Sequence, residues 1–152
     1  MSDLSLPPIS QQLWWVIPER LAGVRKPTEA ELAELMGEGI GALVSLMSDD
    51  GNLELYQRHQ IPHIWVPILG GKAPSLEQVE QIKTFVDEQT CRLGHAVAIH
   101  CSSGRRRTGT VLAALLIKAG DSYEKALNTI LTVNPAVELR EAQINFLKSL
   151  SD

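Results

Sequence analysis

One nine-residue run in this chain carries side chains that could do nucleophilic chemistry: His100-Cys101-Ser102-Ser103-Gly104-Arg105-Arg106-Arg107-Thr108. The apolar residues 96–99 before it predict a buried strand, and the apolar residues 109–117 after it predict a buried helix. A strand, a tight polar loop and a helix N-terminus together bind anions, because successive backbone N–H groups and the helix dipole face the loop. The run therefore predicts an anion-binding loop with a cysteine at its mouth.

The chemistry that fits this loop is phosphoryl transfer to sulfur. The amides and a nearby arginine favour the thiolate of Cys101, which can attack phosphorus and leave a phosphocysteine for water to hydrolyse. Arg107 can offer two parallel N–H donors to the phosphate. Thr108 can donate a hydrogen bond to the sulfur, and His100 can brace the loop through backbone near Cys101. The predicted phosphate-binding residues are Ser102, Ser103, Gly104, Arg105, Arg106 and Arg107.

Each of these residues also has a purely structural interpretation. A lone cysteine that ends a buried strand is more often an inert core residue than a nucleophile. Consecutive arginines usually form a solvated patch, and we keep this interpretation for Arg106 and partly for Arg105. His100 and Thr108 could be a strand-end residue and a helix N-cap. The combination around Cys101, rather than any single residue, favours the catalytic interpretation.

The run resembles the active-site signature of the cysteine-dependent protein tyrosine phosphatases, His-Cys-x-x-Gly-x-x-Arg-Ser/Thr, at all five defining positions. The chain's length and the place of the signature are similar to the dual-specificity branch. The likeness extends to residues 19–23, residues 67–74, Asn134-Pro135 and Gln143. It implies one dual-specificity phosphatase-like domain over residues 1–152. It also implies a phosphomonoester hydrolase, most of all for protein phosphotyrosine, with dual specificity an open option.

One expected residue is missing from this pattern. In the phosphatases that residues 67–74 resemble, an aspartate protonates the leaving oxygen, and Gly70 stands at the matching position. Asp49 or Asp50 could replace it, although both are also suited to a turn with Gly51. Glu138 is a further candidate, with a solvated loop acid as its structural interpretation. The remaining option is that no side chain serves as the general acid.

Three classes of function are therefore open. The first is an active protein phosphatase, and the second is a catalytically weak, phosphate-binding pseudophosphatase. The third is a phosphatase of non-protein substrates such as phosphoinositides, because the extra loop arginines suit highly anionic ligands. None of these chemistries needs a metal or another cofactor.

Composition narrows the setting of this chemistry. The 152 residues are enough for one domain with a sizeable core, and the net charge of −4 argues against nucleic-acid binding. Two cysteines make no disulfide framework, and Cys91 and Cys101 should lie at opposite sheet edges. A working thiolate needs a reducing compartment, so we expect a cytoplasmic protein. We also expect a monomer without a signal peptide or membrane span, with residues 1–10 flexible.

Alternating patterns predict an α/β fold, a central, mostly parallel sheet with helices on both faces and the anion loop between a strand and a helix. Strands are expected at 13–17, 42–47, 63–67 and 96–100. Thr28 with Glu31 and Ser75 with Gln78 predict capping boxes. Helices are expected at 28–36, 53–60, 75–90, 109–117, 122–133 and 140–150. Ligands of such folds bind beyond the C-terminal strand ends, where Cys101 falls.

Overall fold

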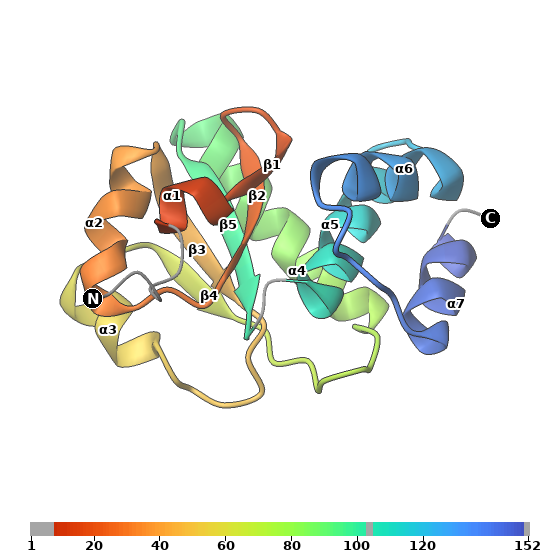
Figure 1. Ribbon diagram of the computed structural model, residues 1–152, viewed down its shortest axis with the longest axis horizontal. Coiled ribbons are helices and arrows are strands. Elements are labelled where there is room, and N and C mark those ends of the chain that lie inside the picture. The colour runs from red at the N-terminus through yellow and green to blue at the C-terminus, as the bar shows by residue number, and fades with distance from the viewer. Residues whose placement is uncertain (1–7, 103–104, 151–152) are drawn as a thin grey trace, which may run out of the picture.

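A five-stranded sheet forms the centre of the protein, as the computed structural model in Figure 1 shows. The structure describes residues 8–102 and 105–150. The strands, in their spatial order, are β1 (Trp14–Ile17), β2 (Leu21–Arg25), β5 (Ala96–Cys101), β3 (Ile40–Ser45) and β4 (His63–Trp65). Only the β1–β2 pair is antiparallel. The predicted mostly parallel sheet is thus confirmed.

Helices cover both faces of this sheet, as the alternating pattern predicted. One face carries α1 (Ile9–Gln12), α2 (Glu29–Gly37) and α3 (Leu53–Arg58). The other face carries α4 (Leu76–Asp87), which continues as a π-helical turn at Glu88–Arg92, and α5 (Arg106–Lys118). It also carries α6 (Tyr123–Val133) and α7 (Glu141–Leu150). Each face buries its own apolar cluster, so the sheet separates two cores.

Local sequence signals account for the starts and ends of these helices. Both predicted capping boxes form, at Thr28 with Glu31 and at Ser75 with Gln78. Helix α5 ends at Lys118, and Gly120 follows shortly after with a φ of 118°, in the left-handed region that glycine adopts without strain. Helix α5 is buried along nearly its whole length, because α4, α6, α7 and the sheet all pack against it. Its first turn is thereby fixed relative to the strand that ends at Cys101.

Several parts of the fold differ from the sequence expectation: α5 begins at Arg106 rather than at residue 109, and β3 spans Ile40–Ser45 rather than residues 42–47. Strand β2 is absent from the predicted set, yet it pairs with β5 along its full length. The expected flexibility of residues 1–10 concerns mostly residues 1–7, which lie outside the described part of the chain. Ile9 is fully buried and the backbone N–H of Ser10 donates to Glu34 at 2.7 Å, so packed structure begins earlier than expected.

Within the described ranges, no helix is long and apolar enough to cross a bilayer. Cys91 is exposed and Cys101 buried, and both thiols are free.

Candidate active site

The C-terminal ends of three parallel strands meet at the start of the signature loop. Cys101 lies opposite Arg25 of β2, and His100 lies opposite Ser45 of β3. Backbone bonds continue past the strands, from Leu46 N to His100 O at 2.9 Å and from Lys26 N to Ser102 O at 3.3 Å. The backbone around Cys101 is therefore held from both sides, at the edge where ligands of parallel sheets bind.

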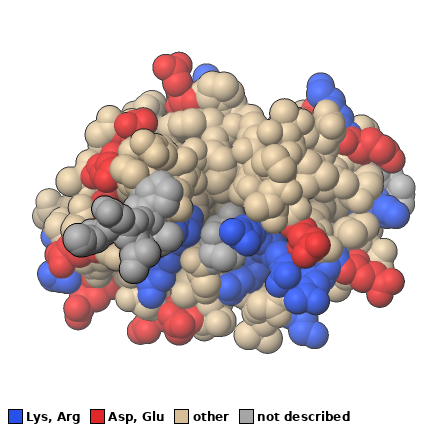
Figure 2. All heavy atoms as spheres, viewed as in Figure 1, with Lys and Arg blue, Asp and Glu red and all other residues tan. Residues whose placement is uncertain are grey.

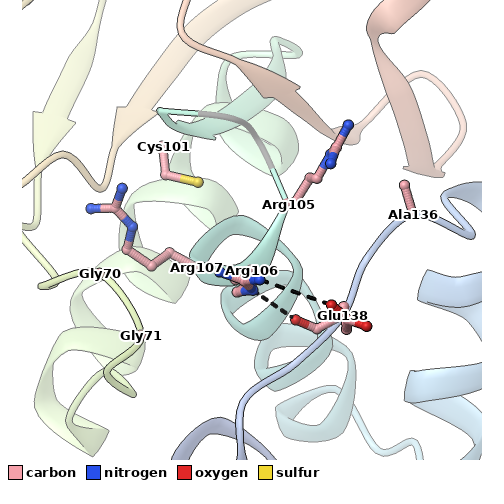
Figure 3. A pocket seen from close by; sticks show the side chains of 8 residues that line it. All are labelled: Gly70, Gly71, Cys101, Arg105, Arg106, Arg107, Ala136 and Glu138. Carbon is pink, nitrogen blue, oxygen red and sulfur yellow. Dashed lines mark hydrogen bonds and ion pairs between the residues drawn. The ribbon is translucent and has the colours of Figure 1, made fainter.

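A pocket opens above the sulfur of Cys101. Figure 3 shows the sulfur turned toward the pocket interior, with Arg107 on one side and Glu138 across from it. The pocket has a volume of about 220 Å³, and its walls come from the signature loop and two other loops. Cys101 is only 2% exposed, and its Sγ accepts a hydrogen bond from Thr108 Oγ1 at 3.1 Å. This bond is the contact that the sequence predicted for Thr108.

Arg107 connects the pocket to two neighbouring loops. Its Nη1 donates to the carbonyl of Ile68 at 2.8 Å and to that of Leu46 at 3.4 Å, and its Nη2 donates to Ser102 Oγ at 3.3 Å. These bonds fix the plane of the guanidinium and do not use Nε. The Nε–Nη2 edge can therefore present two parallel donors to an oxyanion, which is the role that the sequence predicted.

The N-terminus of α5 supplies backbone donors to the same space. Arg105 is the N-cap residue, and its side chain makes no hydrogen bond to the first helical turn. Orphan N–H groups at such a terminus attract anions. Arg105 and Arg106 both line the pocket, and Ser102 is exposed beside it. The predicted phosphate-binding residues Ser103 and Gly104 lie outside the described residues.

His100 is held from behind by a chain of buried polar side chains that the sequence did not reveal. Asn52 Nδ2 donates to the carbonyl of Pro27 at 2.8 Å and to the hydroxyl of Tyr56 at 2.9 Å. The Tyr56 hydroxyl lies 2.8 Å from His100 Nε2. Burial raises the pKa of Tyr56 to about 12, so its hydroxyl stays protonated and donates to His100. Nε2 is then the acceptor, and the ring proton is on Nδ1.

Burial also sets the charge of His100. Burial is the main reason that the pKa of the imidazole is lowered to about 4. The cations Lys26 and Arg107 also lower this pKa, and the interaction with the Cys101 backbone opposes the shift. Nδ1 has no hydrogen bond of standard geometry, although the Cys101 backbone interacts with the ring. His100 is therefore neutral at pH 7. It can brace the Cys101 backbone, as predicted, without adding a charge to the loop.

This buried histidine makes folding stability depend on pH. The unfolded chain protonates His100 near pH 6.5 and the folded protein only near pH 4, so stability is lost as pH falls between these values. Between pH 7 and 5 we expect the free energy of unfolding to fall by about 2 kcal/mol, which corresponds to a fall in Tm of about 4–8 °C. Thermal unfolding of wild type and His100→Asn at both pH values measures this change, and the Tm of the variant should fall less than that of wild type. His59→Gln, which removes an exposed histidine, is the control. Equal slopes for wild type and His100→Asn would contradict this assignment.

The three candidate acids lie in different places. Glu138 lines the pocket, with its side chain 85% exposed. Asp49 and Asp50 are exposed and do not line it, and Asp49 Oδ1 accepts from Gly51 N at 2.9 Å in the turn that was their structural interpretation. This placement favours Glu138 over the two aspartates. Gly70 lies in the wall, and a Cβ built there meets no atom within 4 Å.

The loop that carries Glu138 is held against α5 by close packing. A Cβ at Gly109 would lie 2.9 Å from Val137 Cγ1, so only glycine lets the loop approach this closely. Arg106 Nε donates to the Glu138 carbonyl at 3.1 Å, and Arg106 Nη2 lies 3.9 Å from Glu138 Oε1. Figure 3 shows this pair across from Cys101. Arg106 is thus a partner of the facing loop as well as a residue of the solvated rim.

A sheet with a cysteine and an arginine at its C-terminal edge, and a helix N-terminus facing both, defines the cysteine-dependent phosphatase superfamily that the signature predicted. A sequence profile described as "Polymorphic toxin system, DSP-PTPase phosphatase" matches residues 20–121. The chain belongs to this DSP-PTPase phosphatase family.

Individual relatives differ in how much of the chain they match. Phosphatidylglycerophosphate phosphatase PTPMT2 of Arabidopsis thaliana is 26% identical over 93% of this chain, which spans 64% of that protein. Phosphatidylglycerophosphatase and protein-tyrosine phosphatase 1 of Rattus norvegicus is 37% identical, but over 37% of this chain and 30% of its own length. The chain thus spans less than two thirds of either relative.

Solved structures confirm the fold. Tk-PTP in its active form superposes with a TM-score of 0.82 at 30% identity, covering 92% of this chain and 96% of its own. PTPMT1 in complex with PI(5)P superposes with a TM-score of 0.83 at 17% identity, covering 92% of this chain and 94% of its own. The first likeness supports the family, and the second concerns the fold alone.

Proposed function

We propose that this protein hydrolyses phosphomonoesters through a phosphocysteine formed at Cys101. The observation that carries the proposal is the hydrogen bond from Thr108 to the buried sulfur, at the floor of a pocket lined by Arg107 and the start of α5. These groups orient the sulfur and stabilise the equatorial oxygens of the phosphoryl group in the transition state. Family membership supports the same chemistry.

The reaction takes place in two displacements. The thiolate of Cys101 attacks phosphorus in line with the leaving oxygen, so a P–S bond forms and the P–O bond breaks. The leaving oxygen departs with a proton from an acid or from water. Water then attacks the phosphocysteine, releasing inorganic phosphate and the thiolate. Arg107 and the α5 amides contact the phosphoryl oxygens in both steps.

For the substrate we propose protein phosphotyrosine, with phosphoserine and phosphothreonine poorer. The thiolate chemistry suits a reducing compartment such as the cytoplasm. A second candidate is a non-protein phosphomonoester. Arg105, Arg106 and Arg107 all line the pocket, which suits a substrate of high negative charge, and relatives named as phosphatidylglycerophosphate phosphatases support it.

Turnover of p-nitrophenyl phosphate tests the hydrolytic activity, and a panel of phosphopeptides and phosphoinositides tests the substrate class. Acid quenching during turnover should trap one phosphate on Cys101, which peptide mapping can locate. Binding of phosphate without turnover would overturn the proposal and indicate a pseudophosphatase.

The glycine at the usual acid position should appear in the choice of leaving group. Unaided departure is easier for a phenol, with a pKa near 10, than for an alkyl alcohol. We therefore expect kcat/KM for aryl phosphates to exceed that for alkyl phosphates by about 10²–10⁴-fold. This is the range of rate that positioned acid catalysis would otherwise supply. Among aryl esters, kcat/KM should fall steeply as leaving-group pKa rises. Glu138→Gln, Asp49→Asn and Asp50→Asn test whether an acid serves. A flat series in wild type would contradict the absence of an acid.

A gain-of-function variant tests the same point from the other side. Gly70 lines the pocket and has open space around a built Cβ, so an aspartate fits there without a backbone clash. Gly70→Asp should flatten the leaving-group series by protonating the departing oxygen. Gly70→Asn, which has the same shape and no acidic proton, is the matched control and should leave the series steep. If both variants behaved alike, the residue at position 70 would not act on the leaving oxygen.

A further inference from the structure

Among the described residues, four Lys and Arg side chains without a carboxylate partner lie in the pocket wall or on the loops that flank it: Lys72, Arg105, Arg107 and Arg140. Of the 14 Lys and Arg side chains, all within the described ranges, seven have a carboxylate within 4.0 Å: Arg25, Arg58, Lys83, Arg92, Arg106, Lys118 and Lys125. The other seven are Arg20, Lys26, Lys72, Arg105, Arg107, Arg140 and Lys148. Figure 2 shows Lys and Arg gathered across the lower middle of this face. Because the net charge is −4, this gathering is not an effect of composition.

Two of these cations, Lys72 and Arg140, are brought together by one buried side chain. Gln143 is fully buried, and its Nε2 donates to the carbonyl of Lys72 at 3.2 Å. Its Oε1 accepts from the backbone N–H of Arg140 at 2.9 Å. The amide thus ties the loop that contains Gly71 to the loop that contains Glu138, both of which line the pocket. The backbones of Lys72 and Arg140 are fixed close to each other at the pocket's edge.

The side chains of Lys72 and Arg140 are exposed and have no ion pair among the described residues. Two positive charges on neighbouring, tethered loops favour the binding of an anion between these loops. Glu138 does not supply that anion, because its ion-pair partner is Arg106. The positive charge at this edge is therefore open to a ligand.

We propose that Lys72 and Arg140 form a second anion subsite, so that the preferred substrate carries a second phosphate group on the same compact scaffold. This inference rests on the proposed hydrolysis of phosphomonoesters, and it deepens the second candidate, a non-protein substrate, by naming its class. The scissile phosphate lies in the signature loop over Cys101, and the second phosphate lies at the edge that Gln143 organises. The same chemistry is offered by a free bisphosphate and by a phosphorylated lipid headgroup.

Two substrates that differ in one anion test this subsite. We compare phenyl phosphate with 4-(phosphonomethyl)phenyl phosphate, whose phosphonate cannot be hydrolysed. Wild type should prefer the second substrate by about tenfold or more in kcat/KM, through a lower KM. In Lys72→Gln/Arg140→Gln the ratio should fall to near one. Arg20→Gln/Lys148→Gln removes two cations that Gln143 does not hold at the pocket's edge, so it should keep the wild-type ratio. No preference in wild type, or an equal loss in the control, would overturn the subsite.

A binding experiment separates failure of the subsite from failure of hydrolysis. Calorimetry of Cys101→Ser with both substrates measures affinity without turnover. Tighter binding of the bis-anionic compound with no hydrolysis in wild type would keep the subsite and reject the proposed reaction. Equal affinities, with hydrolysis intact, would reject the subsite alone. Two competitors of the bis-anionic compound are then compared, inositol 1,4,5-trisphosphate in solution and vesicles that contain phosphatidylinositol 4,5-bisphosphate. The comparison distinguishes a free ligand from a lipid headgroup. Competition by either supports the subsite, and competition by neither overturns it.

Discussion

Replacement of Cys101 by serine should abolish turnover, lowering kcat by on the order of 10⁴ or more, while phosphate esters still bind. The sulfur is the atom that the pocket presents to a bound phosphate, and Thr108 donates to it at 3.1 Å. A serine hydroxyl fits the same space but ionises far less readily, so the nucleophile is lost and the anion-binding groups remain. Hydrolysis of p-nitrophenyl phosphate and calorimetry with phenyl phosphate measure the two effects.

The other cysteine provides the control. Cys91 is exposed in the π-helical turn after α4 and does not line the active-site pocket. Cys91→Ser should therefore keep wild-type kinetics and form the phosphoenzyme normally. Activity of Cys101→Ser within tenfold of wild type would show that another group makes the covalent bond or that water attacks directly.

Arg107→Lys should reduce kcat/KM by about 10²–10³, the scale of losing an oriented oxyanion donor. A lysine has one nitrogen, so it cannot hold the carbonyls of Ile68 and Leu46 and also present two parallel donors to phosphate. Arg106→Ala should lose less than about tenfold, because Arg106 bonds the facing loop rather than the loop beneath the sulfur. Steady-state kinetics on both variants, with circular dichroism to confirm folding, measures the difference.

Equal losses in the two variants would contradict the assignment of Arg107 as the phosphate-binding arginine. The comparison is informative because the two residues are adjacent in α5 and carry the same charge. A general effect of positive charge would weaken only Arg106→Ala, which loses a charge. An effect of the fixed guanidinium plane would appear in Arg107→Lys, which keeps its charge.

Sequence reasoning predicted the parts of the fold that depend on local signals. The capping boxes at Thr28 and Ser75 are such signals, and they form as expected. Strand β2 was missed because it contains Gly23 and lacks an alternating pattern. Its burial depends on Trp14, whose ring lies 2.4 Å from where a Gly23 Cβ would be. This contact between two strands has no signature in either segment alone.

The candidate site likewise has residues that a local pattern predicted and residues that it did not. Cys101, Arg107 and Thr108 lie within one short run, so their spacing alone predicted that they would meet. Asn52 and Tyr56 reach His100 across 44 or more residues of sequence, and Gln143 reaches Lys72 across 71. Such pairs depend on the packing of distant loops, which no local pattern encodes. A buried glutamine near Arg140 is an ordinary helix residue until the fold brings Lys72 to it.

The burial of α5 links the anion site to the stability of the whole domain. The buried residues of this helix form one unbroken stretch from Thr108 to Ile117, so its backbone bonds open only when the surrounding core opens. Hydrogen exchange at these amides should therefore report the global unfolding free energy rather than local fraying. An oxyanion bound at the N-terminus of α5 then slows exchange throughout the helix by mass action, even at its far end beside Lys118. Hydrogen exchange at amides far from the pocket therefore reports whether the pocket is occupied.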